Sequence, residues 1–343
     1  ITLISFIEKE NENHIKELQK YCEEIYLVKK KKMKSFFQLF KSLYKDQPLR
    51  VLMNKDSKID TLINMVLRKK SFDIIHVQKR MAPYVKNIKD VKKIVDLIDA
   101  YHLNLKRSLE QNKNIYWPIK YIEFKKTKRY ENKIFKKFDK GLIISKEDKE
   151  ILLKNNKIVV SPNGVDLNYF KTNNFAYEEK TIVFAGNMNY EPNVDAVVYF
   201  AKRILPLIIN QFPNIKFYIV GINPSKEVKN LNKRSNIIVT GFVEDIRNYV
   251  RRAAISVCPL RLGAGLQNKI LEAMSLNVPV VATSLANEGL NALHNKNILI
   301  ADNPKNFAEN IIYLLKNKKE RNRIATEGRK FVKKNFGWNK VVK

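Results

Sequence analysis

The sequence predicts an α/β protein made of two doubly wound domains whose sheets are mainly parallel. The length of 343 residues fits two domains of roughly 150 residues each. Short β-branched apolar runs recur along the chain and are apolar on both faces, as in covered parallel strands. Helical periodicity lies between these runs, so strand and helix alternate as in doubly wound folds. With 45% hydrophobic and 29% charged residues, the composition is globular.

The expected strands share short length and an apolar character on both faces. They span residues 2–6, 25–28, 73–77, 93–98, 141–144, 158–160, 181–185, 216–220, 237–240, 254–258, 279–282 and 297–300. The clearest helix spans 193–211, where apolar residues fall three or four positions apart behind Asn193 as the expected N-cap.

A domain boundary is expected near Asn155 and Asn156. A long basic helix ends before this point, and a strand and the turn 161–164 follow it. The sequence therefore predicts an N-terminal Rossmann-like domain over 1–156 and a C-terminal one over 157–335.

The chain is strongly basic, with 65 Lys and Arg against 34 Asp and Glu and a formal net charge of +31. Such a charge favours anionic partners, namely nucleotides, phospholipid head groups or nucleic acid. AT-rich codon usage is an alternative source of the lysines. In segment 116–138 aromatic residues alternate with lysines, which fits a helix on an anionic membrane or an ordinary helix with an aromatic core face. Lysines at 29–34 would assist the membrane contact.

Several classes of site are not expected. Cys22 and Cys258 are too far apart for a disulfide framework, which favours a reducing cytoplasm. The four histidines lack zinc-ligand spacing, so a catalytic metal is not expected. No run reaches the roughly 18 apolar residues of a membrane-spanning helix.

The segment after the expected strand 254–258 predicts an anion site. A loop containing Gly263 and Gly265 leads into a helix, so its backbone N–H groups would converge at the helix N-terminus. Arg261 and Lys269 flank the loop and would add positive charge for a diphosphate.

Glu272 is a lone acid among apolar positions of this helix. It fits an exposed pair with Lys269, three residues earlier, or a carboxylate that accepts the two hydroxyls of a ribose. The pattern alone leaves both open.

At these residues the sequence resembles retaining glycosyltransferases of the GT-B fold, in the large family of glycogen and sucrose synthases, and most closely the bacterial members of polysaccharide-assembly clusters. The resemblance covers roughly 140–335, whereas the N-terminal part matches loosely. The matching motifs lie at 161–166, 184–188, 192–193, 241–245, 267–274, 279–283 and 288–289.

The resemblance implies two Rossmann-like domains that face a cleft, with 336–343 beginning the segment that crosses back to the first domain. It also implies a nucleotide-sugar in the second domain, as co-substrate and without a metal or other cofactor. Gly221 and Phe242 would line the base and Glu272 would hold the ribose. The expected diphosphate ligands are Gly186, Arg261, Gly263, Gly265 and Lys269.

The sequence departs from the family at three places. Ala264 stands where a glutamate usually contacts the donor sugar, and Asn187 and Asn193 replace a usual Arg and Lys. Ile98 replaces a catalytic-site histidine. The first-domain candidates that remain for catalysis are Asp99, His76, Arg80 and His102.

These observations together predict a retaining, metal-independent glycosyltransferase. It would move a sugar from a nucleotide-sugar to a hydroxyl of a cell-surface saccharide or lipid-linked acceptor, in the cytoplasm or on the inner face of the plasma membrane. A sugar-nucleotide 2-epimerase of the same fold and a non-catalytic basic surface-binding protein are the alternatives. Nucleic-acid binding is not expected, because no recognition motif accompanies the dispersed basic residues.

The resemblance further implies that the first domain lacks its opening strand, loop and helix, on the order of 40 residues, about one strand–helix unit. We therefore expect nucleotide binding without efficient turnover. A protein beginning at Lys157 is expected to bind nucleotide about as well as the whole chain.

Overall fold

The structure is a computed structural model that describes residues 1–7, 15–30, 45–111, 115–152, 157–172 and 177–342. Its contacts divide the chain into two compact units. Unit 1 contains 1–98, 112–142 and 152–159, and unit 2 contains 99–111, 143–151 and 160–343. The boundary expected near Asn155 and Asn156 lies outside the described residues. Two segments from the first half of the chain thus belong to the unit formed by the second half.

Unit 2 is built on a six-stranded sheet in the order β12-β11-β10-β7-β8-β9. All its neighbouring strands pair in parallel, as the two-sided apolar runs predict. The strands are β7 (Glu178–Ala185), β8 (Lys216–Val220), β9 (Ile237–Gly241), β10 (Ala253–Cys258), β11 (Val280–Ala282) and β12 (Leu299–Ile300).

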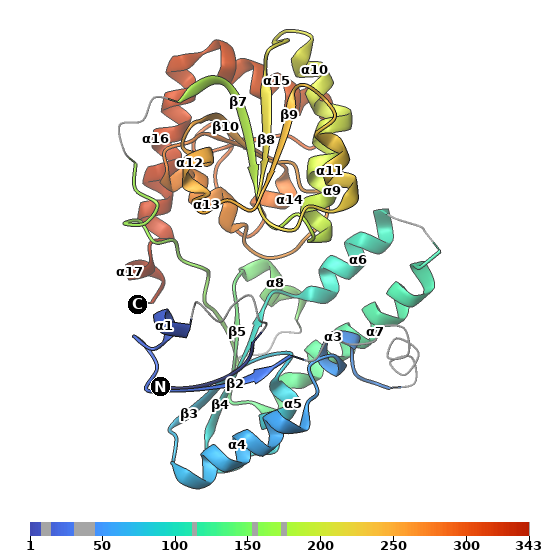
Figure 1. Ribbon diagram of the computed structural model, residues 1–343, viewed down its shortest axis with the longest axis vertical. Helices are drawn as coiled ribbons and strands as arrows, with labels where there is room; N and C mark the ends of the chain where they lie inside the picture. Colours follow the sequence, from blue (N-terminus) through green and yellow to red (C-terminus); the bar gives the residue numbers. More distant parts are fainter. Residues whose placement is uncertain (8–14, 31–44, 112–114, 153–156, 173–176, 343) are drawn as a thin grey trace. The chain divides into compact units, whose positions relative to one another are not determined.

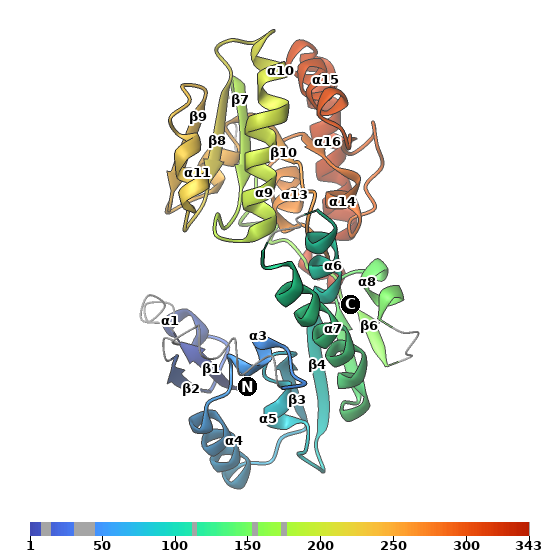
Figure 2. The same cartoon turned by 90° about the vertical axis from the view of Figure 1, so that its right-hand side faces the viewer.

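Helices cover both faces of this sheet (Figures 1 and 2). Helices α9 to α11 follow β7 and β8 on one face, where α15 packs against α10; α13 and α16 pack together on the other. The bounds are α9 (Glu191–Tyr199), α10 (Leu205–Ile209), α11 (Lys226–Leu231), α12 (Arg247–Val250), α13 (Asn268–Ser275), α14 (Ser284–Asn287), α15 (Pro304–Lys316), α16 (Lys318–Asn335) and α17 (Trp338–Val341). From the first half of the chain, α6 (Tyr101–Gln111) and α8 (Lys146–Ile151) complete this unit.

Most of unit 1 is organised around two parallel strand groups. One is the pair β1-β2, and the other is the sheet β3-β4-β5-β6. The strands are β1 (Thr2–Ile7), β2 (Glu24–Lys29), β3 (Ile74–Gln78), β4 (Lys92–Ile98), β5 (Lys140–Ile143) and β6 (Ile158–Val160). The helices are α1 (Ile15–Leu18), α3 (Leu49–Leu52), α4 (Ser57–Lys69), α5 (Ala82–Val85) and α7 (Trp117–Ile134), which ends in a 3-10 turn at Phe135–Lys137. Every expected strand is confirmed, with small shifts at its ends.

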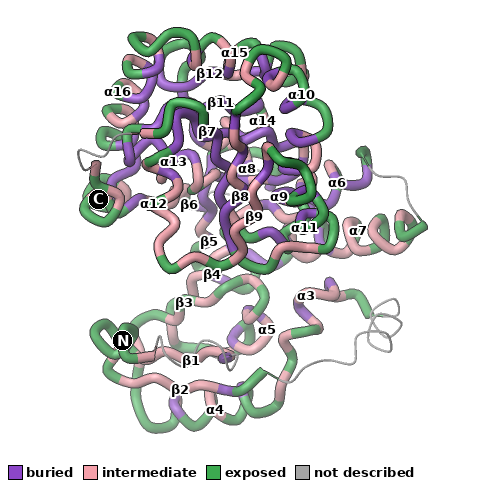
Figure 3. The backbone as a smooth tube through the Cα atoms, turned by 45° about the horizontal axis from the view of Figure 1, so that its top comes forward, coloured by how far each residue is buried: buried purple, intermediate pink, exposed green. Residues whose placement is uncertain are grey.

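The most deeply buried strands lie in unit 2. Every residue of β10 is buried, whereas β1 and β2 are mostly of intermediate exposure. Figure 3 shows β1 and β2 mainly in the colour of intermediate burial. Phe184, Phe200 and Phe217 are fully buried in the core of unit 2. Since burial of a large apolar side chain contributes about 1.5–3 kcal/mol, this core is the more strongly stabilised part of the molecule.

The helix expected over 193–211 is present, but its start differs from the prediction. It runs as α9, a π-helical segment at Phe200–Ile204, and α10. The residue at the N-cap position is Tyr190, and the prediction of Asn193 as the cap was wrong. Pro192 occupies the first turn, where its missing N–H costs nothing, so the helix begins earlier. Asn193 is buried within that turn and its amide is used elsewhere.

Burial in α7 accounts for only part of the basic aromatic segment. Its C-terminal end buries Ile134 and Phe135 in unit 1, with Phe138 just beyond. At its N-terminal end Ile115 is 86% exposed and Tyr116 63% exposed. The aromatic core face therefore accounts for one end of the segment and leaves the other exposed.

Two glycines end adjacent strands of unit 2 with positive φ, but their surroundings differ. Gly221 has φ +144°, and a Cβ there would lie 1.8 Å from the Gly186 carbonyl oxygen. Gly241 has φ +71°, and a Cβ there would meet nothing within 4 Å. Only Gly221 therefore combines an unusual backbone conformation with direct contact against a second strand end.

We predict that Gly221→Ala destabilises the protein by about 2–4 kcal/mol, because backbone strain adds to a steric clash. The matched Gly241→Ala carries the strain alone and should cost about 1–2 kcal/mol. Denaturant unfolding of both variants measures the difference. Equal losses would show that the approach of Gly221 to Gly186 is not tight.

Candidate functional site

The candidate site lies where the winding of the unit 2 sheet reverses. Strands β7 and β10 are neighbours, but the chain leaves β7 toward β8 and leaves β10 toward β11, on opposite sides. The loops that follow these two strands therefore diverge, and a doubly wound sheet binds ligands at this point, beside the carboxyl ends of its strands. The residues predicted to bind a donor follow β7, β8, β9 and β10 in this way.

The loop between β10 and α13 presents free backbone donors. Gly263 has φ +128° and Gly265 has φ +71°, conformations that a residue with a Cβ adopts only with strain. Within the described part of the chain, the N–H groups of residues 263–266 donate no hydrogen bond. The loop leads into α13, whose N-cap residue Gln267 makes no side-chain cap. Successive free N–H groups beside a helix N-terminus are suited to bind an anion, and anion binding by this loop stays a prediction.

Lys269 connects the two diverging segments. Its Nζ donates to Asn193 Oδ1 at 2.9 Å and approaches Gln267 Oε1 at 3.4 Å, and it lies over the Phe184 ring. Burial lowers the pKa of this amine below its usual range. A cation with little water around it interacts more strongly with an anion, so Lys269 is well placed to meet a phosphate at this edge.

Glu272 is not the exposed partner of Lys269. No ion pair within 4 Å joins the two among the described residues, since Lys269 turns to Asn193 and Gln267. Burial raises the pKa of the Glu272 carboxyl above its usual range, with the Lys269 charge opposing this shift. Its carboxylate accepts no hydrogen bond from the described residues. A half-buried acceptor without donors fits a ligand that supplies hydroxyl groups.

At the other end of the site, Gly186, Gly221 and Phe242 follow β7, β8 and β9. A Cβ on Gly186 would lie 2.7 Å from Asn193 Nδ2 and 3.5 Å from Lys269 Cε. Phe242 is 73% exposed although it is a large aromatic residue. The structure thus offers an unburied aromatic ring at the strand end that the sequence assigns to a base.

The Arg261 side chain already has a partner within the protein. Its guanidinium pairs with Asp195 through two hydrogen bonds, at 3.1 and 2.5 Å, and stacks on the Tyr199 ring at 4.3 Å. Such a fork is geometrically strong. A diphosphate contact by Arg261 stays a prediction, and it would require this side chain to leave Asp195.

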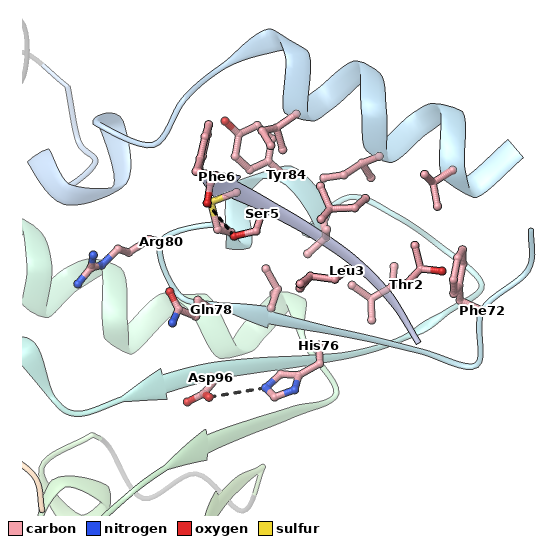
Figure 4. A pocket seen from close by; sticks show the side chains of 18 of the residues that line it. Thr2, Leu3, Ser5, Phe6, Phe72, His76, Gln78, Arg80, Tyr84 and Asp96 are labelled. Atoms are coloured by element: carbon pink, nitrogen blue, oxygen red, sulfur yellow. Dashed lines mark hydrogen bonds and ion pairs between the residues drawn. The ribbon is translucent and has the colours of Figure 1, made fainter. Parts of the chain in front are cut away.

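The structure separates the candidates for catalysis. His76 and Arg80 line one cavity of about 540 Å³ in unit 1, shown in Figure 4. His76 Nε2 lies 3.7 Å from Asp96 Oδ2, and this contact raises the pKa of the imidazole. Asp99 belongs to unit 2, where a Cβ on Gly265 would lie 3.3 Å from its Cβ. His102 is buried on α6. Asp99 is the candidate beside the glycine loop.

Sequence reasoning missed Arg107 on α6. Its Nη1 donates to the Gly263 carbonyl oxygen at 2.6 Å, and its Nη2 donates to both carboxylate oxygens of Glu288 at 2.9 and 2.7 Å. No sequence signal joins Arg107 to this loop, because the two are more than 150 positions apart. The helical periodicity of α6 was its only local pattern.

Sequence reasoning also missed Asp148, a buried carboxyl on α8. Ser145 Oγ accepts from the Asp148 N–H at 3.1 Å and so caps α8. Asp148 is 1% exposed, and its Oδ2 has no hydrogen-bond partner among the residues that the structure describes. The spacing Ser-x-x-Asp, read as a capping box, was available in the sequence to find this feature.

The described residues contain no group of three or more His, Cys, Asp or Glu side chains that could hold a metal ion. Among their helices, none combines the length and the apolar character needed to cross a membrane.

Residues 179–317 match the family model described as glycosyl transferases group 1. A protein of the cps region of Klebsiella pneumoniae is 28% identical over 238 residues, covering 67% of this chain and 60% of that protein. An uncharacterized glycosyltransferase of Methanocaldococcus jannaschii is 27% identical over 216 residues, covering 60% of this chain and 57% of that protein. The chain therefore spans less than two thirds of the length of these curated relatives.

Solved structures show the fold. Sucrose-phosphate synthase from Thermosynechococcus elongatus has a TM-score of 0.71 at 13% identity, covering 99% of this chain and 96% of that one. Anabaena HepE in complex with UDP and glucose has a TM-score of 0.68 at 11% identity, covering 100% and 96%. A mutant of S. aureus TarM in complex with Fondaparinux, alpha-GlcNAc-glycerol and UDP has a TM-score of 0.67 at 17% identity, covering 83% and 57%. The fold is GT-B, as predicted.

Asp148 generates a prediction for the pH dependence of stability. Burial raises its pKa from 3.8 to about 6, so the folded state favours the protonated carboxyl. The contribution of Asp148 to folding stability is therefore highest at low pH. It falls by about 3 kcal/mol in all as the pH rises from the Asp148 pKa of the unfolded state to that of the folded state. The neutral Asp148→Asn should therefore gain stability relative to the parent between pH 4 and 6 and keep that gain above pH 6.

Denaturant unfolding at several pH values measures this difference. Glu150→Gln, on an exposed position of the same helix, is the matched control for loss of one negative charge. A difference between Asp148→Asn and the parent that does not vary with pH would contradict the raised pKa.

Proposed function

We propose that this chain is a retaining, metal-independent glycosyltransferase that moves a sugar from a nucleotide-sugar to a hydroxyl of a cell-surface saccharide or lipid-linked acceptor, at the cytoplasmic face of a membrane. One observation carries the proposal. Free N–H groups of residues 263–266, the desolvated Lys269 and the unsatisfied Glu272 follow one another at the winding reversal of a GT-B domain. They lie within the residues matched to glycosyl transferases group 1.

Each part of a nucleoside diphosphate has a matching group in unit 2. The exposed Phe242 ring offers a stacking surface for a base beside Gly221. The Glu272 carboxylate accepts the ribose hydroxyls, and the diphosphate lies against Gly186, the glycine loop and Lys269. UDP is the first nucleotide to test, because the HepE and TarM structures contain it.

The chemistry proposed for this site is stabilisation of a leaving diphosphate. Negative charge grows on the diphosphate as its bond to the sugar breaks. Fixed N–H dipoles and Lys269 stabilise that charge without reorganisation, and this supports transfer without a metal ion. Asp99, beside Gly265, is our first candidate for a contact with the reacting sugar. His76 and Arg80 are further candidates on unit 1.

The acceptor is proposed on separate grounds. One relative is encoded in a cps region, and the TarM complex contains saccharides. A saccharide acceptor attached to a lipid would bring the enzyme to a membrane.

Helix α7 supports the membrane contact. Ile115, Tyr116, Tyr121 and Ile122 are exposed apolar residues at its N-terminal end. Trp117 and Tyr121 stack at 5.3 Å, and Lys125 lies over the Tyr121 ring. Amphipathic rings with flanking lysines are suited to an anionic membrane interface.

For the donor site, we predict that Glu272→Gln and Lys269→Met both weaken binding of UDP but differ in their effect on binding of uridine. Loss of two charged hydrogen bonds at Glu272 should cost about 3 kcal/mol, roughly a hundredfold in Kd, for uridine and UDP alike. Loss of Lys269 should cost about 2 kcal/mol for UDP and little for uridine. Calorimetric titration measures both.

Lys316→Met on the exposed end of α15 is the control for loss of one positive charge and should bind UDP like the parent. A thermal-shift panel with UDP, GDP and ADP identifies the base, because a ligand at 100 times its Kd adds about 2.7 kcal/mol of stability. If none of them shifts the transition of the parent chain, the proposed function is wrong.

For the membrane contact, we predict that the chain floats with anionic vesicles at low salt and much less at high salt. Each nearby Lys or Arg contributes about 1 kcal/mol, and salt screens this attraction. Ile115→Ser combined with Tyr116→Ser should reduce flotation further. Absence of binding at low salt would leave codon usage as the explanation of the charge.

A further inference from the structure

Polar side chains of helix α6 form hydrogen bonds with the loops at the carboxyl edge of the unit 2 sheet. Asn104 Nδ2 donates to Tyr190 Oη at 3.3 Å, and Ser108 Oγ donates to a Glu191 carboxylate oxygen at 3.0 Å. Near the helix end, Gln111 Nε2 donates to the Arg261 carbonyl oxygen at 3.0 Å. These partners follow β7 and β10, the two strands at the winding reversal. A helix from the first half of the chain therefore borders the proposed diphosphate site. A protein beginning at Lys157 would lack this helix, so equal nucleotide binding by such a protein is no longer expected.

Arg107 makes the strongest of these contacts. Its side chain is 17% exposed and that of Glu288 is 34% exposed, with 2.7 Å between Nη2 and Oε2. The other guanidinium nitrogen holds the Gly263 carbonyl oxygen at 2.6 Å. Partly buried charge-assisted hydrogen bonds are about twice as strong as neutral ones. The guanidinium thus links the glycine loop to the segment that follows α14.

The contact between Arg107 and the Gly263 carbonyl also affects the direction of the next N–H group in the loop, because of peptide geometry. In a trans peptide the Gly263 C=O and the Ala264 N–H lie in one plane and point in opposite directions. Holding the carbonyl toward Arg107 therefore directs the Ala264 N–H away from Arg107. This peptide turns over by rotation at Gly263 ψ and Ala264 φ, and Gly263, with φ +128° and no Cβ, restricts the first rotation less than any other residue would. The contact with Arg107 therefore limits a rotation that the sequence leaves comparatively free.

We propose that Arg107 is a positioning residue for the diphosphate, because it holds the peptide between Gly263 and Ala264 in the orientation that offers its N–H to the anion. This inference rests on the proposed function. Arg107 does not contact the ligand itself. It acts by holding the loop, and its charge also offsets that of Glu288, which would otherwise repel a diphosphate from the neighbouring loop.

The packing around Arg107 explains why Arg is required there. A lysine offers a single ammonium group, whereas the guanidinium presents separate N–H groups in a rigid fork to a carbonyl and a carboxylate. Gly289 packs against the same loop, since a Cβ on it would lie 3.0 Å from the Gly265 carbonyl oxygen. The loop is therefore held from two sides.

Calorimetric titration of the full chain with uridine and with UDP tests the proposal. Arg107→Lys and the double variant Arg107→Met with Glu288→Gln should bind UDP about tenfold more weakly than the parent and bind uridine equally well. The double variant leaves no unpaired carboxylate, so its loss reports the contact with the Gly263 carbonyl. Glu288→Gln alone keeps an acceptor for Arg107 and should bind UDP no more weakly than the parent.

Arg323→Met, which breaks an Arg–Glu pair on α16 at 2.8 Å, is the matched control for stability and should leave both affinities unchanged. A merely structural role for Arg107 would weaken uridine and UDP together and lower the melting temperature. That outcome, or parent-like UDP binding by the double variant, overturns the inference while the donor site stands. A parent chain that binds no nucleotide overturns the proposed function and this inference with it.

Discussion

The functional half of this molecule depends on one constraint, the reversal of winding between β7 and β10. Two parallel strands lie side by side, and their following segments must leave to opposite faces. The loop after β10 therefore diverges from the loop after β7, and the N–H groups of its residues 263–266 have no acceptors in the described chain. Beside the reversal, the ends of β7 and β8 approach closely because the backbone there carries no Cβ, and a Cβ on Gly221 would lie 1.8 Å from the Gly186 carbonyl oxygen. The topology accounts for the diverging loops, and the glycines account for the close packing.

Three cationic side chains near this edge of the sheet each have a partner within the protein. Arg261 is held by Asp195, Arg107 by Glu288, and Lys269 by the amide oxygens of Asn193 and Gln267. Lys269 is the one of these three cations whose partners are neutral, so its charge is not compensated by a carboxylate. Neutral amide partners orient an ammonium group without cancelling its field. This distinction separates a side chain suited to meet an anion from side chains that hold the architecture.

The two units differ in how much of their structure is secured by burial. The unit 2 sheet is covered on both faces and contains the most buried strands. In unit 1, β1 pairs with β2 alone among the described strands, and β3 pairs with β4 alone. The residues with the clearest chemical arrangement lie in unit 2, because rigid packing is what maintains a precise geometry. His76 and Arg80 line a cavity in the less buried unit.

The sequence by itself determined the strands, the parallel character of the sheets and the glycine loop, because each depends on local composition and short spacing. The pattern of elements also placed Lys269 and Glu272 in the helix after the glycine loop, whereas Gly186 and Gly221 were singled out by the family resemblance. What only the tertiary structure decided are contacts between distant residues: Asp195 engages Arg261, Asn193 serves Lys269 instead of capping α9, and Arg107 reaches Gly263. Local periodicity places a side chain on a face of its own element. The partner it meets there is chosen by the packing of the whole chain.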